Sequence, residues 1–170
     1  MSTTPVADQL IDSSVDILLN KSYPRIIKCL GELSDEEIWR RPNENLVSIG
    51  NLILHLCGNM RQWIISGIGG APDKRERAKE FNEKGPIPRT ELIKRLDATL
   101  QEVAQVLRSA DHQQLTQPRT VQGEVTTGVS VIMHVTEHFS YHTGQISLHV
   151  KLLKNIDLGY YKDRDLNVRS

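Results

Sequence analysis

Apolar residues recur every three or four positions in four long segments of this chain, and very little of it alternates with the two-residue period of a strand. The pattern is clearest in SIGNLILHLCGNMRQWIISG (48–67), where one apolar stripe follows the 3.6-residue helical repeat. Amphipathic helices without a sheet to cover must bury their stripes against one another. The sequence therefore predicts an all-α protein, a four-helix bundle.

The four predicted helices differ in how clearly their ends and breaks are marked. In the first, Pro24 predicts a kink or a break near Tyr23, because proline lacks a backbone N–H and its ring clashes with the preceding turn. After it, Ser34 and Glu37 form a capping box that predicts a short helical turn. Ser48 is the expected cap of the second long helix. The predicted helices span about 6–32, 48–67, 90–110 and 129–153.

Two polar connections separate the later helices. The first, 67–88, is punctuated by glycine and proline and is predicted to be irregular. The second, 111–128, is also predicted to be irregular, with a short extended excursion around 120–125. We find no internal repeat or low-complexity tract, so a single domain over 1–170 is expected.

The charge balance excludes some partner classes. Lysine plus arginine and aspartate plus glutamate number 21 each, so no basic excess predicts a nucleic-acid partner and no cationic amphipathic segment predicts a membrane partner. The N-terminal residues lack the basic-then-apolar order of a secretion signal, and we expect a cytoplasmic protein. Cys29 and Cys57 fit no disulfide framework or CxxC site and are expected to be buried free thiols.

Four of the six histidines fall in the last helical segment, at 134, 138, 142 and 149. On a helical wheel, His142 lies at the centre of the apolar stripe, His138 lies within about 40° of it, and His134 lies about 80° away. His138 and His142 therefore point into the bundle one turn apart. Two imidazoles at i and i+4 on one helical face can share a metal ion.

A metal site needs at least a third protein ligand. His149 is seven residues beyond His142, or about 10 Å along the axis, too far to reach the same ion. His112 lies in a polar segment and is expected to be solvated. His55 remains, at the edge of the apolar stripe of the second helix. Three neutral imidazoles from two packed helices, with coordination positions left open, suit Zn, Ni or Fe.

Other interpretations of the same histidines compete with a metal site. A histidine on an apolar face can be a hydrogen-bonded core residue, although burying two unpaired imidazoles is costly. His134–His138 also matches H-x-x-E-H, the inverted zinc-protease motif, but the wheel turns Glu137 away from the bundle. Ferritin-like di-iron chemistry needs inward carboxylates, which the stripe lacks.

The segments LILHLCGNMRQWI (52–64) and HVTEHFSYHTGQI (134–146) resemble the DinB-like (YfiT-like) metalloenzyme superfamily, and the resemblance covers nearly the whole chain. It implies a four-helix bundle that holds a divalent ion through His55, His138 and His142. Members of the superfamily are often homodimers, so a homodimer is expected. Some members transfer low-molecular-weight thiols or isomerise substrates with a thiol cofactor.

These observations predict a metal-dependent enzyme, a thiol (S-)transferase or a hydrolase, that acts on a small molecule. Its catalytic residues are not assigned. Asn59 and Gln62, on the flank of His55, could orient a ligand, and Gln145 could support His142 from outside the coordination sphere. Two alternatives stay open: a non-catalytic metal-binding or stress-response homodimeric module, and a bundle that serves only as a dimerisation or interaction domain.

Overall fold

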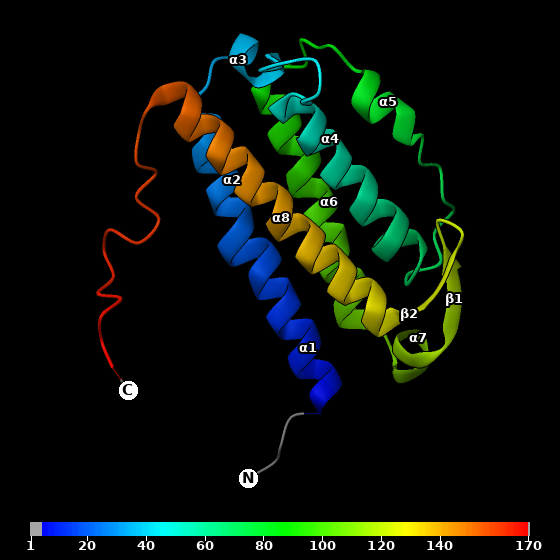
Figure 1. Cartoon of the computed structure of the whole chain (residues 1–170). Coiled ribbons are helices and arrows are strands. Elements are labelled where there is room, and N and C mark those ends of the chain that lie inside the picture. Colours follow the sequence, from blue (N-terminus) through cyan, green and yellow to red (C-terminus); the bar gives the residue numbers. More distant parts are fainter. Residues whose placement is uncertain (1–4, 170) are drawn as a thin grey trace.

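The computed structural model describes residues 5–169 and confirms an all-α bundle with a short two-stranded excursion. Its long helices lie side by side, with α8 crossing in front of α6 and beside α4 and α2 (Figure 1). The helices of the bundle are α1 (Val6–Val15), η1 (Asp16–Ser22), α2 (Tyr23–Gly31), α4 (Ile49–Met60), η2 (Arg61–Ser66), α6 (Arg89–Ser109) and α8 (Gly128–Lys154).

The first predicted helix runs through Pro24 without ending. Its interruption is a change of hydrogen-bond register, because η1 is a π-helical stretch that directly precedes α2. Pro24 lies in the first turn of α2, where the missing N–H and the bulky ring need the wider turn that a π-helix provides. The chain therefore stays helical at Tyr23, and the irregularity predicted there takes the form of the π-helical stretch η1.

Side-chain caps set the starts of several helices as predicted. Ser34 and Glu37 form the capping box of the short helix α3 (Asp35–Trp39). Ser48 caps α4, and its hydroxyl accepts a hydrogen bond from the backbone N–H of Asn51. These caps satisfy backbone N–H groups that have no partner inside a helix.

The two polar connections contain more structure than their sequences predict. The first includes the short helix α5 (Arg77–Asn82), and the second begins with α7 (His112–Thr116). The predicted excursion is a hairpin of β1 (Pro118–Val121) and β2 (Glu124–Thr127). Gln122 and Gly123 form its turn, with φ values of 54° and 83°, as a two-residue hairpin loop requires.

The core lies between α8 and the helices that surround it. Val131, Val135, Phe139 and Ile146 of α8 are at most 1% exposed, whereas Leu153, in its last turn, is 36% exposed. Cys29 and Cys57 are buried and free, as expected. The packing of α8 against α4 and η2 brings the histidine-bearing faces of the two helices together.

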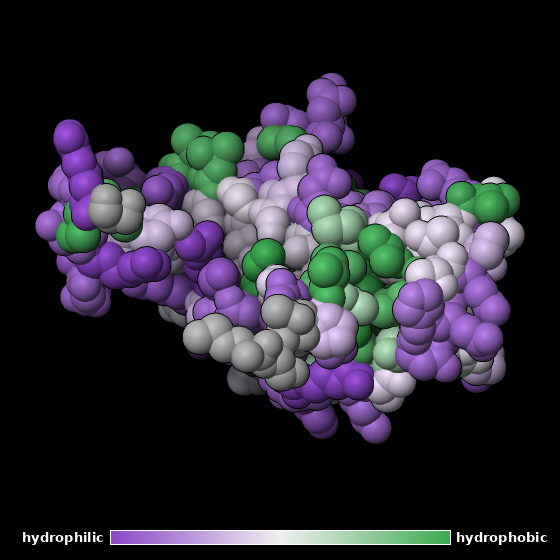
Figure 2. Space-filling view, turned by 90° about the horizontal axis from the view of Figure 1, so that it is seen from below, coloured by the Kyte–Doolittle hydropathy of each residue, from purple (hydrophilic) through white to green (hydrophobic). Residues whose placement is uncertain are grey.

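Apolar side chains also reach the surface. Figure 2 looks at the lower end of the bundle and shows hydrophobic side chains gathered among hydrophilic ones. Val125 in β2 and Val129 and Met133 in the first two turns of α8 are exposed apolar residues. Among residues 5–169, no helix combines the length and the apolar content that crossing a membrane requires.

Candidate metal centre

His55 from α4 converges with His138 and His142 from α8. Each ring offers one ligand nitrogen, and the three atoms lie within 4.8 Å of one another. His55 Nε2 and His138 Nε2 are 2.9 Å apart. Two ligands on one ion lie about 3.0 to 3.4 Å apart when each bond is about 2.1 Å long, so this pair is close to the spacing of a coordination edge.

The three rings differ in exposure. His55 is 5% exposed and His142 is 9% exposed, whereas His138 is half-buried and lies nearest to solvent. Burial, followed by the neighbouring His142 and His55, lowers the pKa of His138 to about 3. A neutral imidazole with a free lone pair is the form that binds a metal ion.

Glu80 orients His55. Its Oε2 lies 2.9 Å from His55 Nδ1, and Arg75 binds the same carboxylate through Nε and Nη2 at 2.7 and 2.9 Å. Arg75 Nη2 is also 3.1 Å from His55 Nδ1, but the ionised Glu80 carboxylate can only accept, so its 2.9 Å contact with Nδ1 requires a proton on Nδ1. His55 Nδ1–H therefore donates to Glu80, which leaves Nε2 unprotonated and facing His138.

Glu80 and Arg75 form a buried ion pair. Their side chains are 10% and 4% exposed. Burial raises the pKa of Glu80, but the hydrogen bonds from Arg75 and His55 outweigh it and lower the pKa overall, so Glu80 is a carboxylate. The pair gives His55 a charge-assisted partner and keeps the local charge balanced.

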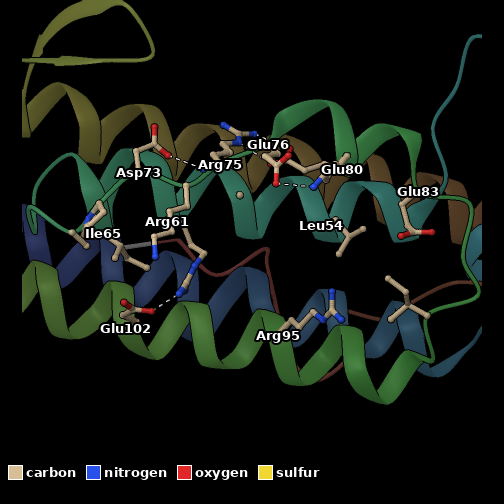
Figure 3. A pocket seen from close by; sticks show the side chains of 16 residues that line it. Leu54, Arg61, Ile65, Asp73, Arg75, Glu76, Glu80, Glu83, Arg95 and Glu102 are labelled. Atoms are coloured by element: carbon tan, nitrogen blue, oxygen red, sulfur yellow. Dashed lines mark hydrogen bonds and ion pairs between the residues drawn. The ribbon is translucent and has the colours of Figure 1, made fainter.

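A glycine in α4 makes room for this pair. A Cβ at Gly58, one turn after His55, would overlap the Glu80 carboxylate and press against Arg75 Nε. Glu80 belongs to α5, and Arg75 lies just before it, so both approach α4 from the connection between η2 and α6. Figure 3 shows them on the wall of a cavity of about 520 Å³ between this connection, α4 and α6.

Neither Glu80 nor Arg75 was predicted from the sequence. Both lie in the connection predicted to be irregular, and neither follows a periodic pattern or a metal-binding motif. The one signal that could have pointed to them is Gly58, a poor helix former in the middle of a strongly periodic helix.

Gln145 lies against His142, one turn along α8. Its Oε1 is 2.6 Å from His142 Nδ1 and accepts the Nδ1–H hydrogen bond. His142 Nε2 is thus left for coordination, as for His55. The sequence suggested Gln145 as a support for His142, and the structure places its side chain in contact with that ring.

The other two predicted contact residues bond elsewhere. Gln62 donates to Asp73 at 2.8 Å and accepts from Arg75 at 2.9 Å, so it belongs to the group that holds Glu80 in place. Asn59 is 3% exposed, and its Nδ2 lies 3.3 Å from His134 Nε2. Asn59 Oδ1 is buried without a partner among residues 5–169.

The inverted protease motif is not assembled. His134 stacks on Trp63 with ring centroids 4.1 Å apart and does not join the ligand group. Glu137 is exposed, as the wheel predicted. His112 is exposed, and His149 lies outside the ligand group. The donor set is therefore three imidazoles, which fits borderline metals such as Zn, Ni or Fe better than Mg or Ca.

Comparison with known proteins gives a family but no activity. The curated proteins gave no significant match. A family described as proteins of unknown function, DUF1572, matches residues 11–161, which include the three histidines, Glu80 and Gln145. Because the match spans most of the sequence, this chain belongs to the DUF1572 family.

Proposed function

We propose that the protein is a metal-dependent enzyme that acts on a small molecule, with His55, His138 and His142 as the metal ligands. One observation carries the proposal: within residues 5–169, the ligand group holds three residues and no fourth histidine, cysteine, aspartate or glutamate. Structural zinc sites use four protein ligands, whereas catalytic sites use three and leave a position open.

We propose thiol (S-)transfer or hydrolysis as the reaction. A divalent ion such as Ni, Zn or Fe would, when bound, lower the pKa of a water or a low-molecular-weight thiol. The protein's own cysteines do not supply that thiol, because neither joins the ligand group and burial raises the pKa of Cys57 to about 11. A thiol cofactor would therefore come from solution. The three-histidine bundle also supports the proposed kinship with the DinB-like superfamily.

The surrounding residues have separate proposed roles. Glu80 accepts a hydrogen bond from His55 Nδ1–H, and Gln145 accepts one from His142 Nδ1–H. The Nε2 lone pairs of both rings are thereby left to bind one ion. Gln62 steadies Arg75 and through it Glu80. Asn59 is the candidate for orienting a ligand, because its buried Oδ1 has no partner among the described residues.

Cobalt-loaded protein tests whether the site is open. We expect Co²⁺ to bind with one equivalent and 2-mercaptoethanol to add a saturable thiolate-to-cobalt charge-transfer band that is absent in His138→Ala. Turnover of the metal-loaded protein with a panel of thiols and electrophiles, and separately with ester and phosphoester substrates, then distinguishes transfer from hydrolysis. One bound equivalent of metal without thiol binding or turnover would instead support the alternative, a non-catalytic metal-binding or stress-response homodimeric module.

We also propose that the protein forms a homodimer through the exposed face of α8. Met133, Tyr141 and Leu148 on this face are 56%, 62% and 57% exposed. A Cβ at Gly144, near the middle, would meet no atom of the described residues within 4 Å. Exposed Glu137 and Lys151 lie seven residues on either side of Gly144. Two antiparallel copies of α8 crossing there would place each glutamate opposite the lysine of the other copy.

Light scattering tests this dimer. We expect a mass of twice 19.3 kDa for the wild type. Glu137→Lys should shift the protein toward the monomer through like-charge repulsion, and the double variant Glu137→Lys with Lys151→Glu should restore the dimer. Val168→Lys, on the exposed tail, serves as the control and should leave the mass unchanged. A wild-type protein that stays monomeric at high concentration would contradict the proposal.

A further inference from the structure

A second cavity lies on the side of α8 that faces the first helix. It has a volume of about 280 Å³ and is bounded by η1, the start of α2, α8 and Tyr160 of the C-terminal tail. On α8 it is lined by residues of the face that carries Thr143 and Ser147, whereas His138 and His142 lie toward α4. It is therefore separate from the metal centre.

The charged residues that line this cavity are all basic. Among residues 5–169, the cavity is lined by Lys21 and Arg25 and by no aspartate or glutamate. The 520 Å³ cavity of Figure 3 differs, because acidic and basic residues line it together. Lys21 forms an ion pair with Asp16 at 2.7 Å, but Arg25 has no carboxylate partner among residues 5–169.

Arg25 is held in place by aromatic rings rather than by an acid. Its guanidinium lies 5.1 Å from the Tyr160 ring centroid and 5.4 Å from that of Tyr161, and it donates one hydrogen bond, of 2.7 Å, to the Tyr161 hydroxyl. A guanidinium has five N–H donors. Most of the donors of Arg25 have no partner among residues 5–169 and can bind a ligand.

Ser22 adds a hydroxyl that has no hydrogen-bond partner among the described residues. It is 4% exposed, lines the cavity, and makes no side-chain hydrogen bond to the residues that the structure describes. On the opposite wall, Thr143 and Ser147 each donate to the carbonyl four residues earlier, at 2.8 Å. Ser22 ends η1, where the π-helical register shifts the carbonyls, and π-helical stretches are frequent at functional sites. A hydroxyl that lines the cavity without a bond to another described residue can donate to a ligand there.

We propose that this cavity binds the phosphate group of a small molecule, with Arg25 as the main ligand-binding residue and Ser22 as a second donor. A planar guanidinium binds two phosphate oxygens side by side. The Ser22 hydroxyl, together with the nearby ammonium of Lys21, offers donors for a third oxygen. The proposal is independent of the metal centre, since none of its residues belongs to the group of three histidines.

Titration of the full chain with inorganic phosphate, followed by amide NMR, tests the proposal. We expect saturable shifts centred on residues 21–25 and 140–147, in metal-loaded and in chelator-treated protein alike, and weaker binding of acetate at the same ionic strength. Arg25→Gln should weaken phosphate binding at least about tenfold, because it removes both the charge and the paired donors. Lys28→Gln is the matched control: it removes an equal charge from an exposed residue of α2 that does not line the cavity.

Two further variants separate binding from a structural effect. Ser22→Ala should weaken binding several-fold while leaving the tail in place. Tyr161→Phe removes the hydrogen bond of Arg25 to the tail but keeps the guanidinium, and it should bind phosphate as the wild type does. Equal weakening by Arg25→Gln and Lys28→Gln, shifts confined to the histidine cluster, or no saturation would each overturn the proposal.

Discussion

The His138→Ala variant is expected to purify and reconstitute with almost no transition metal, whereas the wild type takes up about one equivalent. His138 Nε2 lies 2.9 Å from His55 Nε2, and its removal leaves two imidazoles where the ion needs three. Elemental analysis of untagged protein after dialysis against Zn²⁺, Ni²⁺ or Fe²⁺ measures this directly. Loss of a residue that only hydrogen-bonds to a metal ligand typically weakens metal binding by roughly 10- to 100-fold. Loss of the ligand His138 itself should weaken metal binding by more than this.

Variants of the supporting residues should give an intermediate result. Glu80→Gln keeps the size of the side chain but replaces the charged carboxylate that accepts the hydrogen bond from His55 Nδ1–H with a neutral amide. Gln145→Ala removes the side chain that accepts the hydrogen bond from His142 Nδ1–H. Each should weaken metal binding about 10- to 100-fold without abolishing it. Gly58→Ala should do the same indirectly, because the added methyl group displaces the Glu80 carboxylate.

His149→Ala is the matched control for these variants. His149 is a half-buried histidine on the same helix but lies outside the ligand group, so its loss should leave the metal content unchanged. His134→Ala distinguishes the inverted protease motif. Loss of metal in His134→Ala together with full retention in His142→Ala would refute the assigned ligand set.

Metal is expected to raise the melting temperature of the wild type by roughly 5 to 15 °C. An ion that binds only the folded chain at 100 to 1,000 times its Kd stabilises it by about 2.7 to 4.1 kcal/mol, and each kcal/mol shifts the melting temperature of a chain of this size by about 2 to 4 °C. His55 and His138 are 83 residues apart in sequence, so the unfolded chain cannot hold them around one ion as the bundle does. Calorimetry with and without Zn²⁺ measures the shift.

Two controls accompany the thermal measurement. Mg²⁺ should give almost no shift, because three imidazoles suit borderline metals rather than hard ones. His138→Ala should lose the Zn²⁺ shift while keeping the metal-free melting temperature close to that of the wild type. A chelator that leaves the unfolding curve of the metal-loaded wild type unchanged would count against a site that joins α4 to α8.

Much of the fold could be predicted from the sequence because its signals are local. The apolar periodicity marked the long helices, Ser34 and Ser48 marked helix starts, and the polar stretch around 120–125 indicated the excursion. The π-helical stretches η1 and η2 and the short helix α5 were not predicted. They depend on packing and on hydrogen-bond register rather than on apolar spacing.

For the site, the sequence by itself determined that His138 and His142 share one face of α8, since a spacing of four residues decides that in any α-helix. Only the tertiary structure decided which groups surround them. The packing of α4 against α8 brings His55 into contact with His138. The packing of α5 against α4 lets the Glu80 side chain pass Gly58 and contact His55. Periodicity describes one helix at a time, whereas a ligand set built across helices depends on interhelical contacts that no single segment encodes.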